Sequence, residues 1–145
     1  MLGSNPKDTV ARLVNVFHRT VFNTTKGRLL GKLGGMPVVM LTTTGRKSGE
    51  QRTTPLMYLD DGDRWVVVAS NGGADWEPGW WLNLRAGSPA TVAVNGTRTP
   101  VTGTEITGSE RERLWQVLND QVFDYDAYQR KVSRQIAVVA LAPTT

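Results

Sequence analysis

Four residues in one short segment have side chains that could bind an anion. Arg46, Lys47 and Ser48 lie between the glycines of Gly45–Gly49, and Arg52 follows three residues later. Turn amides, a hydroxyl and arginine side chains bind phosphate or carboxylate oxygens, and each hydrogen bond to a charged group contributes about 1.5–3 kcal/mol. The spacing does not match a Walker A loop, and a solvated charged turn is the alternative interpretation.

Aromatic residues form a second group that could contact a ligand. Trp76, Trp80 and Trp81 fall within six positions, close to Asn83. Tryptophan is mostly buried in proteins, so packing in the core is one interpretation of this group. An aromatic wall beside a flat heterocycle is the other.

Two tyrosines near the end of the chain could donate a proton. Tyr125 and Tyr128 are three residues apart. A phenol can donate a hydrogen bond or a proton to an oxygen that becomes negative during a reaction. Because residues at this spacing share one helix face, the pair could also be a packed helix edge.

The composition excludes several kinds of site. The 145 residues contain no cysteine and one histidine, His18. This removes disulfides, thiolate nucleophiles and multi-histidine metal centres, and it favours a reducing cytoplasm. The acidic turn Asp60–Asp63 lacks the length and terminal glutamate of an EF-hand, and no G-x-S-x-G elbow or G-x-G-x-x-G loop occurs. No metal site is predicted.

Positive charge is concentrated in the first part of the chain. Residues 1–52 contain nine Lys/Arg and two acids, a charge of +7, whereas residues 53–145 carry −3, giving the net charge of +4. One end of the fold is therefore expected to attract an anion, with nucleic acid, phospholipid headgroups and a phosphorylated cofactor as the candidates.

The N-terminal region is predicted to consist of a helix and a connector. Apolar residues in 8–23 recur at helical spacing, which favours a helix packed on the core. A basic amphipathic helix on a membrane surface is the alternative, so peripheral membrane contact is considered. Residues 24–35 are too rich in glycine for a stable element. No stretch is long and apolar enough to span a bilayer.

The rest of the chain predicts a small antiparallel barrel. Asn95-Gly96 is a two-residue hairpin signal, and Ser109 with Glu112 has the spacing of a capping box that opens a helix. A short helix is expected from Pro78 to Arg85. Strands are predicted at 38–44, 51–59, 64–70, 90–94, 98–106 and 136–141. Because most links between strands are short, the fold class is α+β and mainly antiparallel, with helices at the periphery.

In order along the chain, four motifs resemble the deazaflavin-dependent nitroreductase family. They are Leu41–Gly49 (LTTTGRKSG), Arg52–Leu56 (RTTPL), Ala69–Gly73 (ASNGG) and Trp80–Leu84 (WWLNL). These are split-β-barrel proteins, with an FMN-binding-like fold, that use reduced coenzyme F420. The resemblance implies a cofactor-binding barrel over residues 36–145, after the helix and flexible connector of residues 1–35.

The resemblance also implies roles for individual residues. The phosphate and acidic tail of F420 would be held by Arg46, Lys47, Ser48 and Arg52. Tyr125 matches a tyrosine over the active site of the family, and Tyr128 matches a second one, so both are the expected catalytic residues. The deazaflavin ring would be lined by Thr53, Thr54, Pro55, Leu56, Met57, Val68, Ala69, Ser70, Asn71, Gly79, Trp80, Trp81, Leu82 and Asn83.

Two positions depart from the family pattern. Asn71 stands where many members have lysine, and Val122 stands where some have another tyrosine. Loss of one cation that faces a phosphate could weaken cofactor binding by about 1 kcal/mol. A changed acceptor preference or a looser substrate pocket is the expected consequence, rather than a loss of the chemistry.

The expected function is hydride transfer from reduced F420 to a quinone, enone or nitro-type acceptor. A deazaflavin carries the redox chemistry, so the protein needs only to bind and orient it, which agrees with the lack of a triad or carboxylate pair. A split barrel that binds FMN or haem, a non-catalytic F420 carrier, and a small basic barrel that binds RNA are the alternatives. No nucleic-acid partner is expected, because the tryptophans fall in a predicted helix and not on a strand face.

Overall fold

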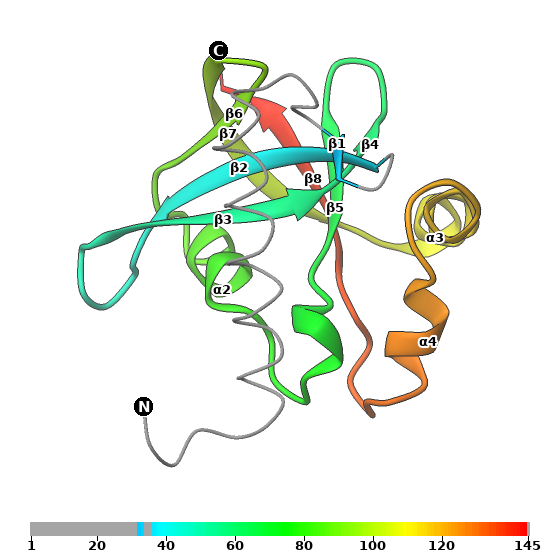
Figure 1. The fold of residues 1–145 in the computed structure, drawn as a ribbon. Helices are drawn as coiled ribbons and strands as arrows, with labels where there is room; N and C mark the ends of the chain where they lie inside the picture. The colour runs from blue at the N-terminus through cyan, green and yellow to red at the C-terminus, as the bar shows by residue number, and fades with distance from the viewer. Residues whose placement is uncertain (1–31, 34–35, 145) are drawn as a thin grey trace.

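The computed structural model describes residues 32–33 and 36–144, and all strand pairings in this part of the chain are antiparallel (Figure 1). The strands are β1 (Lys32–Leu33), β2 (Met36–Thr44), β3 (Gln51–Met57), β4 (Leu59–Asp60), β5 (Trp65–Val68), β6 (Ala90–Val94), β7 (Thr97–Ile106) and β8 (Val138–Pro143). The helices are the 3-10 turn η1 (Asn71–Gly73), α2 (Gly79–Arg85), α3 (Gly108–Gln121) and α4 (Tyr125–Gln129).

The strands form one curled sheet in the order β1-β2-β6-β7-β8-β5-β4, with β3 on β2 as well. The β6–β7 hairpin has the predicted two-residue turn, in which Asn95 and Gly96 both have positive φ angles, of 49° and 84°. Asparagine and glycine tolerate this left-handed conformation, which follows the right-handed twist of the flanking strands. The predicted antiparallel barrel is confirmed.

The chain crosses between the two ends of the sheet at Tyr58, which corrects the single strand predicted at 51–59. β3 ends at Met57 on β2, and β4 begins at Leu59 on β5, so only one residue separates two different strand partners. The Tyr58 N–H donates to Pro37 O at 3.2 Å. An alternating pattern of residues cannot show such a change of partner, because both segments remain extended.

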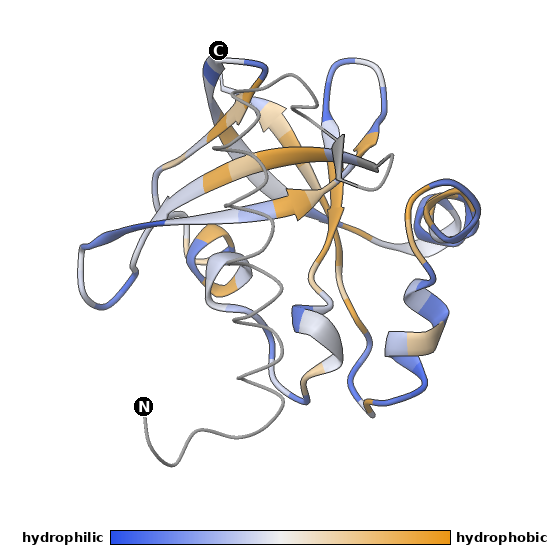
Figure 2. Ribbon diagram, viewed as in Figure 1, coloured by the Kyte–Doolittle hydropathy of each residue, from blue (hydrophilic) through white to orange (hydrophobic). Residues whose placement is uncertain are grey.

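Side chains of β5 and β8 alternate between two hydrophobic clusters. Val67 and Val139 point into the barrel, where they pack with α2, while Val66 and Val138 pack beneath α3 on the other face. All four are fully buried. This is the double burial that the uninterrupted apolar run in the third predicted strand indicates. Figure 2 shows the apolar centre of the sheet and the hydrophilic β2–β3 turn.

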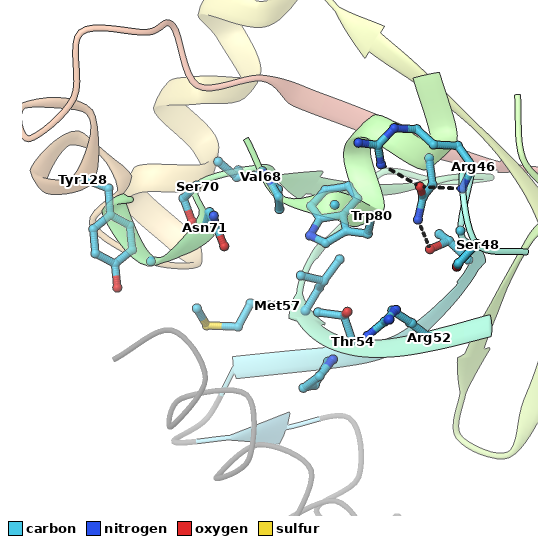
Figure 3. Close-up of a pocket in the computed structure, with 18 of the residues that line it drawn as sticks. Arg46, Ser48, Arg52, Thr54, Met57, Val68, Ser70, Asn71, Trp80 and Tyr128 are labelled. Carbon is cyan, nitrogen blue, oxygen red and sulfur yellow. Dashed lines mark hydrogen bonds between the residues drawn. The ribbon is translucent and has the colours of Figure 1, made fainter. Parts of the chain in front are cut away.

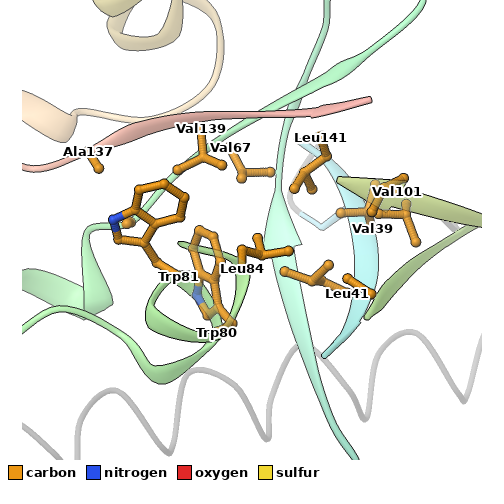
Figure 4. Close-up of a cluster of buried hydrophobic side chains, with 13 residues drawn as sticks. Val39, Leu41, Val67, Trp80, Trp81, Leu84, Val101, Ala137, Val139 and Leu141 are labelled. Atoms are coloured by element: carbon orange, nitrogen blue, oxygen red, sulfur yellow. The ribbon is translucent and has the colours of Figure 1, made fainter. Parts of the chain in front are cut away.

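The barrel cluster brings α2 against the sheet (Figure 4). Trp80 and Trp81 are both buried there, next to Leu84. Leu84 approaches β7 so closely that a Cβ atom on Gly103 would lie 2.8 Å from its Cδ1 atom. The helix that carries two tryptophans is therefore fixed against the sheet.

The helix after β7 begins two residues earlier than the capping-box pattern predicts. Thr107 is the N-cap of α3 and makes no side-chain cap bond, and Gly108 has a φ angle of 67°. The turn at Gly108 places Ser109 inside the first helical turn, where its hydroxyl cannot cap. The predicted capping box is wrong, although the helix forms.

The helix predicted at residues 8–23 lies outside the described residues, as does most of the connector at 24–35. Within the connector, Lys32 and Leu33 pair with Pro37 and Met36, so the expectation that this segment contains no regular element is corrected. A ladder this short needs only the main chain of β2 beside it. None of the helices described here is long and apolar enough to cross a membrane.

Candidate functional site

Five segments surround a cavity of about 410 Å³. They are the β2–β3 turn, β3, the end of β5 with η1, the start of α2, and α4. Figure 3 shows Arg46 and Ser48 at one end of the cavity, Tyr128 at the other, and Trp80 between them. The cavity therefore has a cationic end, an apolar middle and an aromatic end.

The cationic end is built by a tight turn between β2 and β3. Gly45 N–H donates to Glu50 O at 2.8 Å, and Gly49 N–H donates to Gly45 O at 2.9 Å. A Cβ atom on Gly45 would lie 2.5 Å from Ser48 Oγ, and Gly49 has a φ angle of 75°. The two glycines are thus required by the turn, which leaves Arg46 exposed at the mouth of the cavity.

The Asn83 side chain joins α2 to this turn. Its Oδ1 atom accepts two hydrogen bonds from Arg46, one from the main-chain N–H and one from Nη1, both at 3.0 Å. Its Nδ2 atom donates to Thr43 Oγ1 at 3.1 Å, and both residues are buried. A buried amide with these three bonds fixes the Arg46 guanidinium before any ligand binds.

Arg52 adds a second arginine on the same side of the cavity. Thr43 is its partner across the β2–β3 ladder, so both side chains lie on the face of the sheet that carries the site. Its Nη2 atom lies 3.7 Å from Glu50 Oε1, and both side chains are 72% exposed. An exposed ion pair of this length contributes little, so Arg52 can turn to another anion.

The middle of the cavity is apolar. Its walls are Pro55, Leu56 and Met57 of β3, with Val68 and Trp80 opposite. Successive helix residues differ by about 100° in direction, so Trp80 can reach the cavity while Trp81 points into the core. Trp81 is therefore a core residue, and Trp80 packs in the core and also lines the cavity, whereas Trp76 is exposed and does not line it.

The wall after β5 has an unusual main-chain conformation. Asn71, Gly72 and Gly73 have φ angles of 51°, 64° and 83°. The Asn71 Nδ2 atom donates to Trp76 O at 3.1 Å, which fixes the loop. At the position where a lysine is common in the resembling family, this side chain is thus used inside its own loop.

The aromatic end consists of Tyr125 and Tyr128. Tyr125 is buried, with its ring centroid 5.5 Å from that of Phe123, and Tyr128 stacks on Phe123 at 5.2 Å. Burial raises the pKa of both phenols, and for Tyr125 the rise is large. Both tyrosines therefore keep their protons at neutral pH. Each phenol can donate a hydrogen bond through its O–H and can accept one through an oxygen lone pair.

Most residues that the sequence analysis assigned to the site line this cavity, but four do not. They are Thr53, Ala69, Trp81 and Leu82. Thr53 follows the alternation of its strand onto the opposite face, where its hydroxyl lies 2.7 Å from Thr42 Oγ1. Ala69 is fully buried in the barrel cluster.

The cavity also has lining residues that the sequence analysis did not assign. They are Thr43, Gly45, Gly72 and Pro78. Thr43 could have been found from its alternation with Leu41, since every second residue of a strand shares a face. Among the described residues, no three His, Cys, Asp or Glu side chains gather to hold a metal ion.

Comparisons with known proteins agree on one family. The family model described as F420H(2)-dependent quinone reductase matches residues 14–143. A curated relative, an F420H(2)-dependent quinone reductase of Mycobacterium tuberculosis, is 38% identical over 128 residues, which is 86% of each chain.

Solved structures support the same grouping. One, named as an F420-H2 dependent reductase, has a TM-score of 0.65 and 36% identity, covering 72% of this chain and 93% of that one. Another, described as a domain-swapped dimer, has a TM-score of 0.66 and 32% identity, covering 94% and 99%. The chain has the split β-barrel fold that the resemblance implies.

Proposed function

The chain belongs to the F420H(2)-dependent quinone reductase family, and on this premise we propose how its cavity serves hydride transfer from reduced coenzyme F420 to a quinone, enone or nitro-type acceptor. In this proposal the β2–β3 turn binds the anionic tail of F420, and the apolar middle holds the deazaflavin ring. The acceptor occupies the aromatic end beside Tyr125.

One observation carries the proposal: a cationic turn and an apolar slot share one cavity of about 410 Å³. The donor set of Arg46, Lys47, Ser48 and Arg52 suits phosphate and carboxylate oxygens. A flat, largely apolar ring suits the slot between Leu56 and Trp80. The residues present therefore fit the cofactor at both of its chemically different ends.

The protein's own residues bind, orient and donate. Bound F420 supplies the hydride, so no nucleophile or acid–base pair is required from the chain. Fixed geometry then contributes most to the rate, and the Asn83 bonds to Arg46 provide it at the tail end. At the other end, the protonated Tyr125 phenol donates a hydrogen bond to the acceptor oxygen that becomes negative.

The test is a titration of F420 against variants of the turn. Arg46→Ala and Lys47→Ala each remove one charged donor, so each should weaken F420 binding about 10- to 100-fold. Arg98→Ala is the matched control, because Arg98 is exposed on β7 and does not line the cavity. Quenching of tryptophan emission gives the affinity.

Unchanged affinity in both turn variants would overturn the tail assignment. Turnover distinguishes a reductase from a carrier that binds F420 without reaction. A reductase oxidises reduced F420 in the presence of a menaquinone analogue or a cyclohexenone, and a carrier does not. Reduced FMN and NADPH serve as alternative donors in the same assay.

A further inference from the structure

One arginine outside the cavity reaches three carbonyl groups of the cavity wall. Arg134 lies in the connection between α4 and β8. Its Nη1 atom donates to Ala69 O at 3.2 Å, and its Nη2 atom donates to Ser70 O and Ala74 O, both at 3.1 Å. The side chain is half-buried, and no role in the reaction proposed above accounts for it.

The three carbonyls belong to the loop that has the left-handed residues 71–73. This conformation turns the three carbonyl groups toward Arg134. Carbonyl oxygens that are shielded from water need hydrogen-bond donors from the protein. A planar guanidinium has five N–H donors in a fixed fork and can serve carbonyls that a single ammonium cannot reach together. The residues between these carbonyls include Ser70, Asn71 and Gly72, which line the cavity.

Arg134 is itself held by the helix that carries the tyrosines. Gln129, the last residue of α4, donates from Nε2 to Arg134 O at 2.7 Å and accepts from Ile136 N–H through Oε1 at 2.9 Å. Gly73 and Tyr128 touch across the same junction, where a Cβ on Gly73 would lie 3.0 Å from Tyr128 Cδ1. The η1 wall and α4 are therefore joined through one network.

The partial burial of this cation has a cost, which two nearby acids reduce. Burial lowers the pKa of Arg134, and the charges of Glu77 and Asp75 oppose that effect. The Nε atom is buried and has no hydrogen-bond partner among the described residues. An apolar side chain at this position would avoid these costs but would leave the three carbonyls without the donors that the guanidinium supplies.

We propose that Arg134 is a positioning residue for hydride transfer, which sets the Ser70–Gly72 wall against α4 so that Tyr125 and Tyr128 meet the acceptor in the reactive geometry. The inference rests on the function proposed above. It concerns the aromatic end of the cavity, and the anionic tail is bound at the other end. Loss of Arg134 should therefore lower kcat more than it weakens F420 binding, because the cationic turn that binds the tail is unchanged.

The experiment compares Arg134→Ala and Arg134→Lys with Arg111→Ala as the matched control. Arg111 is also half-buried and donates to a carbonyl of the same connection, Ile136 O at 2.7 Å, but it does not line the cavity and has no hydrogen bond to the three wall carbonyls that Arg134 binds. Both Arg134 variants should lower kcat about 10- to 100-fold. F420 affinity should stay within about threefold of wild type, because the charged donors of the β2–β3 turn remain in place. Arg111→Ala should keep the wild-type kcat.

Rescue separates positioning from a general loss of folding. Methylguanidinium added to Arg134→Ala should restore part of kcat, and methylammonium should not, because only the former has the fork. If Arg134→Ala does not fold, Arg134→Lys keeps the buried charge and decides the question alone.

Two results would overturn the proposal. They are a wild-type kcat in Arg134→Lys, and equal losses of kcat in Arg134→Ala and Arg111→Ala. Wild-type protein that neither binds nor oxidises F420 would instead contradict the proposed function itself.

Discussion

At the scale of single residues, the two tyrosines of the aromatic end differ in a way that matters for chemistry. Tyr125 is 4% exposed, whereas Tyr128 is half-buried and stacked on Phe123. In the part of the chain that the structure describes, the Tyr125 hydroxyl has no hydrogen-bond partner, and the residue lines the cavity. A phenol in this position has its donor available for an acceptor.

Tyr125→Phe should lower kcat while leaving F420 affinity within about twofold, because it removes one hydrogen bond at the acceptor end and keeps the ring packing. The loss of kcat should be about 10- to 100-fold. Stopped-flow oxidation of reduced F420 by a quinone measures it. Tyr58→Phe is the control, because Tyr58 does not line the cavity. An equal loss in both variants would argue against a specific role for Tyr125.

At the scale of elements, α2 connects the core to the cationic turn. Trp81 and Leu84 fix the helix in the barrel cluster, and Asn83 on the same helix holds Arg46. The position of the tail site thus depends on a helix of seven residues. The side-chain amide of Asn83 therefore links the packing of α2 in the core to the position of Arg46 at the cationic turn.

Asn83→Leu should weaken F420 binding about tenfold without removing any cation, because Arg46 loses its preset conformation. Unfolding by urea should show a loss of about 1–3 kcal/mol from the unsatisfied partners. Asn119→Leu is the control, since Asn119 also bonds two main-chain groups, Trp115 O in α3 and the Asp126 N–H in α4, and does not line the cavity. Unchanged affinity in Asn83→Leu would show that the Arg46 conformation is not limiting.

Local patterns were sufficient to predict most elements. The Asn95-Gly96 turn, the helix with Trp80 and the doubly buried third strand are all as expected. The change of partner at Tyr58 and the start of α3 depend on tertiary pairing, which alternation along one segment does not contain. The cationic turn and the tyrosines were identified from the sequence because their side chains have chemistry of their own.

The parts of the site that were missed are those that act through the main chain. Nothing in the sequence around Arg134 distinguishes it from an ordinary surface arginine, since its partners are carbonyls 60 to 65 positions away. Thr53 and Trp81 were assigned to the cavity because contiguous stretches were carried over from the family. The Thr53 hydroxyl instead bonds to Thr42, and the 100° step of a helix turns Trp81 into the core.

At the scale of the whole molecule, the three tyrosines of the chain share one property. Burial raises the pKa of Tyr58, Tyr125 and Tyr128, with a further rise at Tyr58 from the charge of Asp60. In an unfolded chain, tyrosine loses its proton near pH 10. Stability from these phenols is therefore fully present below about pH 10 and is lost as the pH rises further, since the unfolded chain then binds fewer protons.

The free energy of unfolding should fall above about pH 10, by about 1.4 kcal/mol per pH unit from Tyr125 alone. Urea unfolding at several pH values between about 8.5 and 11 measures the slope. Tyr125→Phe is the control, because it has no proton to lose and its slope should be shallower. Equal slopes in the two proteins would show that Tyr125 is not the group responsible.

The place of β8 in the sheet has a consequence for how the protein is made. β8 lies between β7 and β5, and Val68 pairs with Val138. A ribosome that adds about 5–20 residues per second needs several seconds to pass from one of these valines to the other. During that time the nascent β5 has two apolar faces and, on the side of β8, an edge of unpaired main-chain N–H and C=O groups, so we expect a chaperone to shield this strand until synthesis has passed β8.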